Sequence, residues 1–210
     1  MKLLRVGELG KEKPAALDKA GKIRDLSQHV IDFNPSTLNF ETLEKLKKIN
    51  LDSLPEVSSS IRIGSCIAKP GKFLAIGLNY SDHAAETNAE IPKEPIVFNK
   101  AANCMVGPND NIILPKHSKK LDWEIEIAFV IGKNTKYVNE KDAPNHILGY
   151  CIVNDISERE WQIERGGTWD KGKSGDTFGP TGPYLITQDE IKDVQNLSMS
   201  LDIDGKRMQT

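Results

Sequence analysis

The segment from Asp122 to Gly132 constrains the fold more than any other part of the chain, because it has the pattern of a buried strand that contains acidic residues. Side chains of a strand alternate between its two faces, so Glu124 and Glu126 share one face and the isoleucines that follow them take the other. Two carboxylates among apolar neighbours repel each other and resist desolvation unless a positive charge lies beside them. A divalent cation with oxygen ligands is one such partner, and a solvated outer strand face is the other interpretation.

Composition excludes several classes of protein. The 210 residues are 38% hydrophobic, enough for a core, and Lys+Arg 28 against Asp+Glu 30 leaves no basic surface typical of nucleic-acid binding. The first residues have too short an apolar stretch for a signal peptide, and no apolar run is long enough to span a membrane. The chain has three cysteines, an odd number, without Cys-x-x-Cys spacing: Cys66, Cys104 and Cys151. This pattern favours a reducing cytosol over a disulfide framework. We expect a soluble cytoplasmic protein that binds neither nucleic acid nor membrane.

The chain divides into two parts by its pattern. Residues 1–60 predict a small α/β unit, and residues 61–210 predict many short strands separated by Gly and Pro. The expected strands are 2–6, 15–18, 23–26, 62–67, 72–77, 96–98, 111–114, 125–131, 148–153 and 184–187, and the expected helices are 40–50, 81–88, 140–148 and 158–164. This pattern predicts a mostly β (α+β) fold, packed as two sheets or as a roll.

The last residues predict a hairpin. The segment from Leu197 to Ile203 alternates as a strand, and Asp204-Gly205 is a strong two-residue turn. The returning strand, 206–210, ends early and leaves pairing groups open, so we expect the natural protein to continue beyond Thr210.

A histidine and a glutamate follow the strand that ends at Gly77. On a helix beginning near Ser81, His83 and Glu86 are three residues apart and therefore neighbours on one face. A carboxylate beside an imidazole orients the ring and raises its basicity, as a general base requires. An ordinary surface ion pair on a helix is the alternative.

A further acidic residue and a lysine lie downstream. Asp155 follows an apolar strand, where it could be a cation ligand or a helix N-cap. Lys173 lies in a stretch rich in Gly and Pro, 169–183, and is either a desolvated site residue or an exposed charge.

Together these segments resemble one known family. The order His-x-x-Glu, Glu-x-Glu, Asn-Asp with a downstream Gln, and Lys-x-x-Asp-Thr-Phe-Gly-Pro, from about Lys69 through Pro183, is similar to the fumarylacetoacetate hydrolase family. Residues 156–162 and 169–173 look most like its bacterial ureidoglycolate lyase-like branch, which includes 2,4-diketo-3-deoxy-sugar-acid hydrolases. Residues 2–5 and 23–27 agree with the same branch.

The resemblance implies roles for particular residues. Glu124, Glu126 and Asp155 match the family's ligands for Mg²⁺ or Mn²⁺, and His83 with Glu86 matches its water-activating dyad. Lys173 matches a lysine that stabilises negative charge on the substrate. Gln162 and Arg159 match polar residues that contact the substrate. The implied fold is a mixed β-roll, usually a homodimer. The implied reaction is hydrolysis of a carbon–carbon bond in a 2,4-dioxo acid, which gives 2-oxo acid products.

Two alternatives stay open. A ureidoglycolate lyase or an oxaloacetate-type decarboxylase would use the same cation. The family core also has a further carboxyl-terminal portion after the position of Thr210, so an inactive truncated member, acting as a binding or dimerisation module, is the non-enzymatic interpretation.

Overall fold

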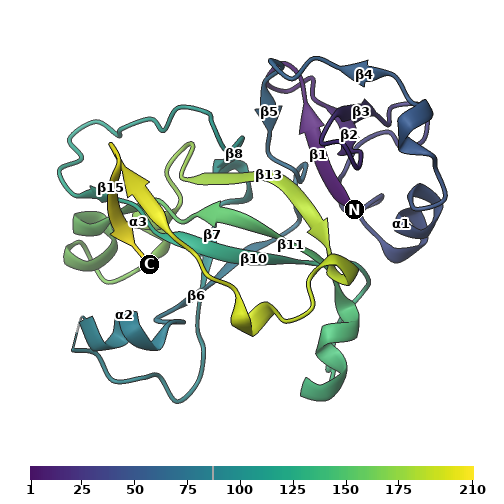
Figure 1. The fold of residues 1–210 in the computed structure, drawn as a ribbon. Coiled ribbons are helices and arrows are strands. Elements are labelled where there is room, and N and C mark those ends of the chain that lie inside the picture. The colour runs from purple at the N-terminus through teal and green to yellow at the C-terminus, as the bar shows by residue number, and fades with distance from the viewer. Residues whose placement is uncertain (87) are drawn as a thin grey trace.

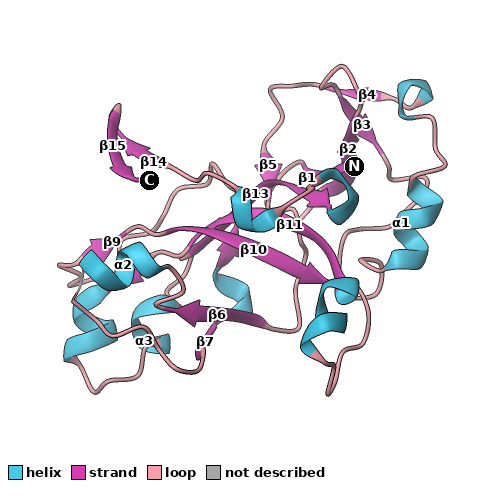
Figure 2. Cartoon of the chain, turned by 60° about the horizontal axis from the view of Figure 1, so that its bottom comes forward, coloured by secondary structure: helices cyan, strands magenta, loops and turns pink. Residues whose placement is uncertain are grey.

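Strands dominate the structure, a computed structural model that describes residues 1–86 and 88–210 (Figures 1 and 2). The strands are β1 (Lys2–Val6), β2 (Lys13–Leu17), β3 (Ile23–Asp25), β4 (Glu56–Val57), β5 (Ile63–Gly64), β6 (Phe73–Gly77), β7 (Ile96–Lys100), β8 (Met105–Val106), β9 (Leu121–Asp122), β10 (Ile125–Ile131), β11 (Ile147–Asn154), β12 (Ser157–Glu158), β13 (Gly179–Thr187), β14 (Leu201–Ile203) and β15 (Lys206–Gln209). The prediction of a mostly β (α+β) fold is confirmed.

Helices are short throughout the described residues. The α-helices are α1 (Phe40–Leu46), α2 (Ser81–Glu86) and α3 (Asp170–Lys173), and a π-helix spans Glu160–Glu164. The 3₁₀ helices are Leu51–Ser53, Ala102–Cys104, Glu140–His146, Gln188–Glu190 and Val194–Asn196. None of the helices in the part of the chain that the structure describes has the length and apolar character needed to cross a membrane.

One large sheet connects the beginning of the chain to its later strands. Its order among the described residues is β10-β11-β13-β1-β2-β3-β4, with β5 beside β1 and β8 beside β13. Its pairings are antiparallel except the parallel one between β8 and β13, and β1 meets β13 with Leu3 opposite Leu185. Separate two-stranded pairs are formed by β6 with β7, β9 with β12, and β14 with β15. The large sheet contains strands from both sides of residue 60. The predicted domain division at that residue stays a prediction.

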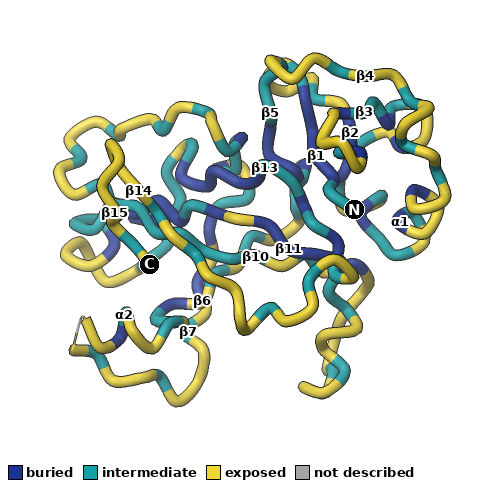
Figure 3. The backbone as a smooth tube through the Cα atoms, in the orientation of Figure 1, coloured by how far each residue is buried: buried dark blue, intermediate teal, exposed yellow. Residues whose placement is uncertain are grey.

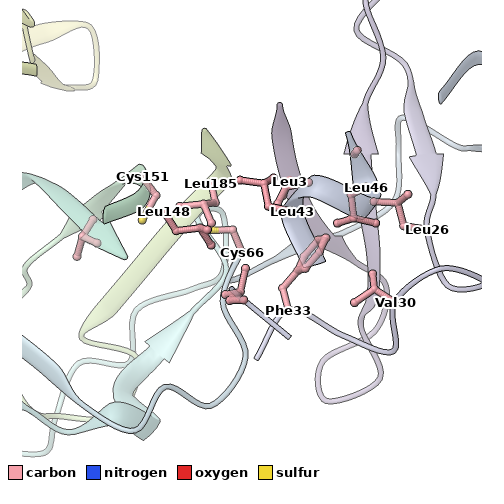
Figure 4. Packing of buried hydrophobic residues seen from close by; sticks show 13 residues of the cluster. Leu3, Leu26, Val30, Phe33, Leu43, Leu46, Cys66, Leu148, Cys151 and Leu185 are labelled. Atoms are coloured by element: carbon pink, nitrogen blue, oxygen red, sulfur yellow. The ribbon is translucent and has the colours of Figure 1, made fainter. Parts of the chain in front are cut away.

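The main hydrophobic core lies between the large sheet and residues 26–54, which include α1 (Figures 3 and 4). Leu3 from β1, Leu148 from β11 and Leu185 from β13 meet residues that precede and line α1. Labelled members of this cluster in Figure 4 are Leu3, Leu26, Val30, Phe33, Leu43, Leu46, Cys66, Leu148, Cys151 and Leu185. Ala128 and Val130 of β10 also pack against it, so the face of β10 that faces the core is the one with Glu126.

Several predicted elements are wrong in extent or type. Residues 111–114 form no strand: the Ile113 N–H bonds to the Thr177 side-chain oxygen at 2.7 Å instead of to a strand, and Ile113 is 57% exposed. The segment predicted as a helix over 140–148 is a 3₁₀ helix that contains Pro144, which has no N–H to donate. The first predicted helix, 40–50, ends at Leu46, after which the Lys48 and Ile49 N–H groups bond three residues back, the tighter 3₁₀ spacing.

Candidate active site

Backbone hydrogen bonds hold Glu124 and Asp155 side by side where β10 begins and β11 ends. The Glu124 N–H donates to the Asn154 side-chain oxygen at 3.1 Å, and the Asp155 N–H donates to the Glu124 carbonyl at 2.8 Å. Glu126 follows on the same face of β10, opposite Val153 of β11. The two strands therefore deliver three carboxylates to one end of the sheet. Asp155 is followed by the short strand β12, so it is not the N-cap of a helix.

The ammonium group of Lys173 bridges two of these carboxylates. Its Nζ lies 2.7 Å from Glu124 Oε2 and 2.8 Å from Asp155 Oδ2. The Lys173 side chain is only 2% exposed, so it is not a solvated surface charge. It comes from the last residue of α3, and its Nζ also lies 5.2 Å from the centre of the Phe98 ring. A buried ammonium in this position is favourable because the carboxylates neutralise it.

A second buried lysine lies on the other side of Asp155. Lys100, the last residue of β7, has its Nζ 2.6 Å from Asp155 Oδ1 and is 1% exposed. Oδ1 nevertheless lacks a partner in hydrogen-bonding geometry, so this contact is an ion pair without a well-directed hydrogen bond. Burial raises the pKa of Asp155 and the two ammonium groups lower it by more, so the net pKa is below its usual value.

Arg159 is a third cationic side chain, beside Lys173 and Lys100, that pairs with the carboxylates of the site. Its Nη2 lies 2.6 Å from Glu124 Oε1 and 2.8 Å from Asp122 Oδ2, and its Nη1 donates to Gln162 Oε1 at 3.1 Å. Gln162 is buried within the π-helix, a rare helix type that is frequent at functional sites. Arg159 therefore contacts a carboxylate of the site directly, and Gln162 is joined to it through Arg159.

Glu126 is the carboxylate with the least positive charge around it. Burial, with repulsion from Glu124 and Asp155, raises the pKa of Glu126 to about 7, although Asn79 and Lys173 act in the opposite direction. The Asn79 side-chain N–H donates to Glu126 Oε2 at 2.9 Å. In the metal-free protein Glu126 therefore keeps its proton up to about neutral pH, and a nearby cation would favour its ionised form.

His83 and Glu86 lie on α2, which begins two residues after Asn79. The distance from His83 Nδ1 to Glu86 Oε2 is 3.9 Å, longer than a hydrogen bond, and both side chains are accessible to solvent. α2 projects from the end of β6 at the lower left of Figure 1. Asn79, which precedes α2, donates to Glu126. Among the other predicted residues, Lys173 joins Glu124 to Asp155, and Arg159 joins Glu124 to Gln162.

The donor set fits a hard divalent cation by its chemistry. Three carboxylates supply oxygen ligands, and Glu126 has the least positive charge of the three around it. As the side chains stand, the described residues contain no group of three His, Cys, Asp or Glu side chains arranged to hold a metal ion. The ammonium of Lys173 lies between Glu124 and Asp155 in this arrangement.

Three residues of this site escaped the sequence prediction: Lys100, Asn79 and Asp122. Lys100 had a readable signal, since it lies two residues after the buried Phe98 and so shares its inward strand face. Asn79 and Asp122 had none, because their partners are 47 and 37 residues away in the chain.

Comparison with known proteins places this chain in a family. The sequence profile described as fumarylacetoacetate (FAA) hydrolase, C-terminal, matches residues 72–210. The chain belongs to the fumarylacetoacetate hydrolase family, a group of hydrolases and isomerases that generally use a divalent metal.

Relatives agree with this assignment. A protein of Burkholderia orbicola (strain MC0-3) that is provisionally named a hydrolase is 56% identical over 209 residues. The match covers 100% of this chain and 74% of that protein. The solved structure of fumarylacetoacetate hydrolase from Exiguobacterium antarcticum is 28% identical with a TM-score of 0.81, and the match covers 100% of this chain and 74% of the other. A 5-carboxymethyl-2-hydroxymuconate delta-isomerase from Mycobacterium smegmatis is 26% identical with a TM-score of 0.76 and the same coverage.

Proposed function

We propose that this protein is a Mg²⁺- or Mn²⁺-dependent hydrolase that cleaves a carbon–carbon bond in a 2,4-dioxo acid. The observation that supports this most is the cluster of Glu124, Glu126 and Asp155 around the buried ammonium of Lys173. Such a cluster combines oxygen ligands for a hard cation with a positive charge that a developing anion needs. Membership in a family of hydrolases and isomerases is consistent with it.

Glu124, Glu126 and Asp155 would hold the cation. When bound, it would act as a Lewis acid toward the 2-oxo acid end of the substrate. Mg²⁺ and Mn²⁺ both accept this set of oxygen ligands, and an added cation of either kind would favour the ionised form of Glu126.

The other predicted site residues divide the remaining work. His83, with Glu86 beside it, would take a proton from a water molecule, whose oxygen adds to the more distant carbonyl carbon of the substrate. The bond between that carbon and the neighbouring CH₂ then breaks, and the CH₂ carbon takes up a proton, so that one water is consumed and an acid and a 2-oxo acid are released. Lys173 would stabilise the negative charge that develops, while Arg159 and Gln162 would orient the substrate.

The substrate class rests on the sequence resemblance. We propose a 2,4-diketo-3-deoxy sugar acid, because residues 156–162 and 169–173 look most like the branch with that activity. An isomerase is the second candidate, favoured by the names of two structural neighbours from Mycobacterium species, a 5-carboxymethyl-2-hydroxymuconate delta-isomerase and a 2-hydroxyhepta-2,4-diene-1,7-dioate isomerase. Ureidoglycolate lyase and oxaloacetate decarboxylase activities remain further outcomes of the same test.

Purified protein, stripped of metal and then supplied with Mg²⁺ or Mn²⁺, is offered a diketo sugar acid, a 2-hydroxymuconate, ureidoglycolate and oxaloacetate in separate reactions. We expect 2-oxo acid release from the diketo acid, lost on chelation and restored by either metal. The variant His83→Ala should lose turnover and keep Mn²⁺ binding, whereas His29→Ala, an exposed histidine in the leading segment, should lose neither. No turnover of the diketo acid would remove the preferred substrate, and turnover without any metal would refute the proposed metal dependence.

We also propose a cytoplasmic homodimer. Large apolar side chains stand exposed on the outer face of β10 and β11, including Phe129 and Ile152, and such a surface favours association. The cysteines among the described residues are free thiols, which suits a reducing compartment. Light scattering coupled to gel filtration tests the dimer: we expect twice the mass of one chain, and a single-chain mass would contradict it.

A further inference from the structure

We propose that Lys100 is a positioning residue that fixes Asp155 and the end of α3 in the geometry that the site requires. No role for this lysine follows from the sequence motifs or from the proposed reaction. The inference rests on the proposed function, since it concerns the same site. It depends on what the Lys100 ammonium contacts and on where those contacts lie.

The Lys100 ammonium joins three separate segments. Its Nζ lies 2.6 Å from Asp155 Oδ1 and donates to the Ile156 carbonyl at 3.3 Å and to the Lys173 carbonyl. The first two partners follow β11, and the third is the last residue of α3. One buried side chain therefore holds both a carboxylate of the cluster and the backbone that presents the Lys173 ammonium to it.

The two lysines divide the oxygens of Asp155 between them. Lys100 approaches Oδ1 and Lys173 approaches Oδ2, so the carboxylate is held from both sides. Rotation of Asp155 would break at least one of these buried ion pairs, and an unpaired buried charge is unfavourable. Of these two lysines, Lys173 is the one that also contacts Glu124. Lys173 thus belongs to the reacting centre, and Lys100 acts through Asp155 and Lys173.

The surrounding backbone would keep β7 and α3 together without Lys100. The Asn99 N–H donates to Asp170 Oδ1 at 3.0 Å, and the Ala101 N–H donates to the Ser174 hydroxyl oxygen at 2.9 Å. These bonds lie on both sides of Lys100 in the chain. Replacing the lysine side chain therefore removes the contacts to Asp155 and to the carbonyls while the docking of the two elements remains.

The variant Lys100→Met tests the role through the sign of its effect on metal binding. If Lys100 were only a counter-charge, its removal would make the site more negative and Mn²⁺ would bind more tightly. If it positions Asp155, Mn²⁺ should bind about 10–100-fold more weakly, as when the supporting partners of metal ligands are lost. Free Mn²⁺ is followed by electron paramagnetic resonance during titration. Lys45→Met, which removes an exposed lysine of α1, is the matched control and should bind as wild type does.

Turnover gives a second readout. We expect kcat to fall at least tenfold with KM within threefold, and Lys100→Met to lower kcat less in the Lys173→Met background than in wild type, because part of its effect passes through Lys173. Lys100→Gln keeps two donors for the carbonyls and replaces Lys100→Met if the latter does not fold. Failure of both to fold, while Lys173→Met folds, would overturn the positioning role in favour of a purely structural one.

Failure of this inference differs from failure of the proposed function. Wild type that binds Mn²⁺ while Lys100→Met binds it equally or more tightly would refute the role of Lys100 alone. Wild type that binds no Mn²⁺ would refute the metal dependence, and a crystal structure of Lys100→Met would then decide: displaced Asp155 and Lys173 side chains support the inference, and unchanged positions overturn it.

Discussion

Replacing Glu126 with Gln should remove a pH dependence of stability that this carboxyl imposes on the metal-free protein. Burial raises its pKa from an ordinary value of 4.5 to about 7, whereas the unfolded chain keeps the ordinary value. Between these values the folded protein binds more protons at Glu126 than the unfolded chain does, so the free energy of unfolding falls as the pH rises. The destabilisation is absent below pH 4.5 and fully developed above about pH 7.

The magnitude follows from the same interval. A separation from 4.5 to about 7 corresponds to roughly 3 kcal/mol, and solvent screening of a carboxyl that is only partly buried reduces this to about 2 kcal/mol. Gln has the shape of protonated Glu and its oxygen can still accept the Asn79 N–H. The variant therefore matches wild type at low pH and lacks the charge at high pH.

Urea unfolding in the presence of a chelator, at steps from pH 5 to pH 8, measures this difference. We expect the variant to be more stable than wild type by only about 0.5 kcal/mol at pH 5 and by about 2 kcal/mol at pH 8. Subtracting one curve from the other cancels the titration of distant groups. A difference that stays flat over this range, or wild type gaining stability relative to the variant as the pH rises, would refute the reasoning.

Three further predictions concern other residues of the site. Asp155→Asn leaves Lys100 and Lys173 with less compensating charge, so the metal-free protein should lose about 3 kcal/mol in urea unfolding; an unchanged midpoint would contradict this. Lys173→Met should lower kcat about 10²–10³-fold in the diketo acid assay, and near-normal kcat would exclude it from charge stabilisation. Gly77→Ala places a Cβ 2.3 Å from the Trp169 ring, so thermal or urea unfolding should show a loss of about 1–3 kcal/mol, whereas Gly71→Ala, whose Cβ meets no atom within 4 Å, should show none.

Local patterns predicted the parts of the site that lie close together in sequence. Alternation along a strand put Glu124 and Glu126 on one face, and an apolar strand followed by Asp155 put that carboxylate at a strand end. The turn at Asp204-Gly205 joins β14 and β15 as the dipeptide predicts. Such features depend on residues within a few positions of each other, which a pattern records directly.

Local patterns failed where exposure or packing decided. Residues 111–114 are apolar enough for a strand, yet they lie on the surface and bond to Thr177. The sequence also did not determine which face of β10 is turned toward the core. The isoleucines and Phe129 are the more apolar set, but Ala128 and Val130 face the core together with Glu126. Alternation defines two faces and does not say which one the rest of the protein covers.

The amino-acid sequence by itself determined which carboxylates share a strand face and that strands would dominate the fold. Only the tertiary structure decided which positive charges meet them. Lys173 reaches Glu124 across 49 positions of the chain, and Lys100 reaches Ile156 beside Asp155 across 56, because strand register and the docking of β7 against α3 bring them together. A buried charge is stable only beside its partner, and that partner is chosen by packing between distant segments, which no local pattern of residues specifies.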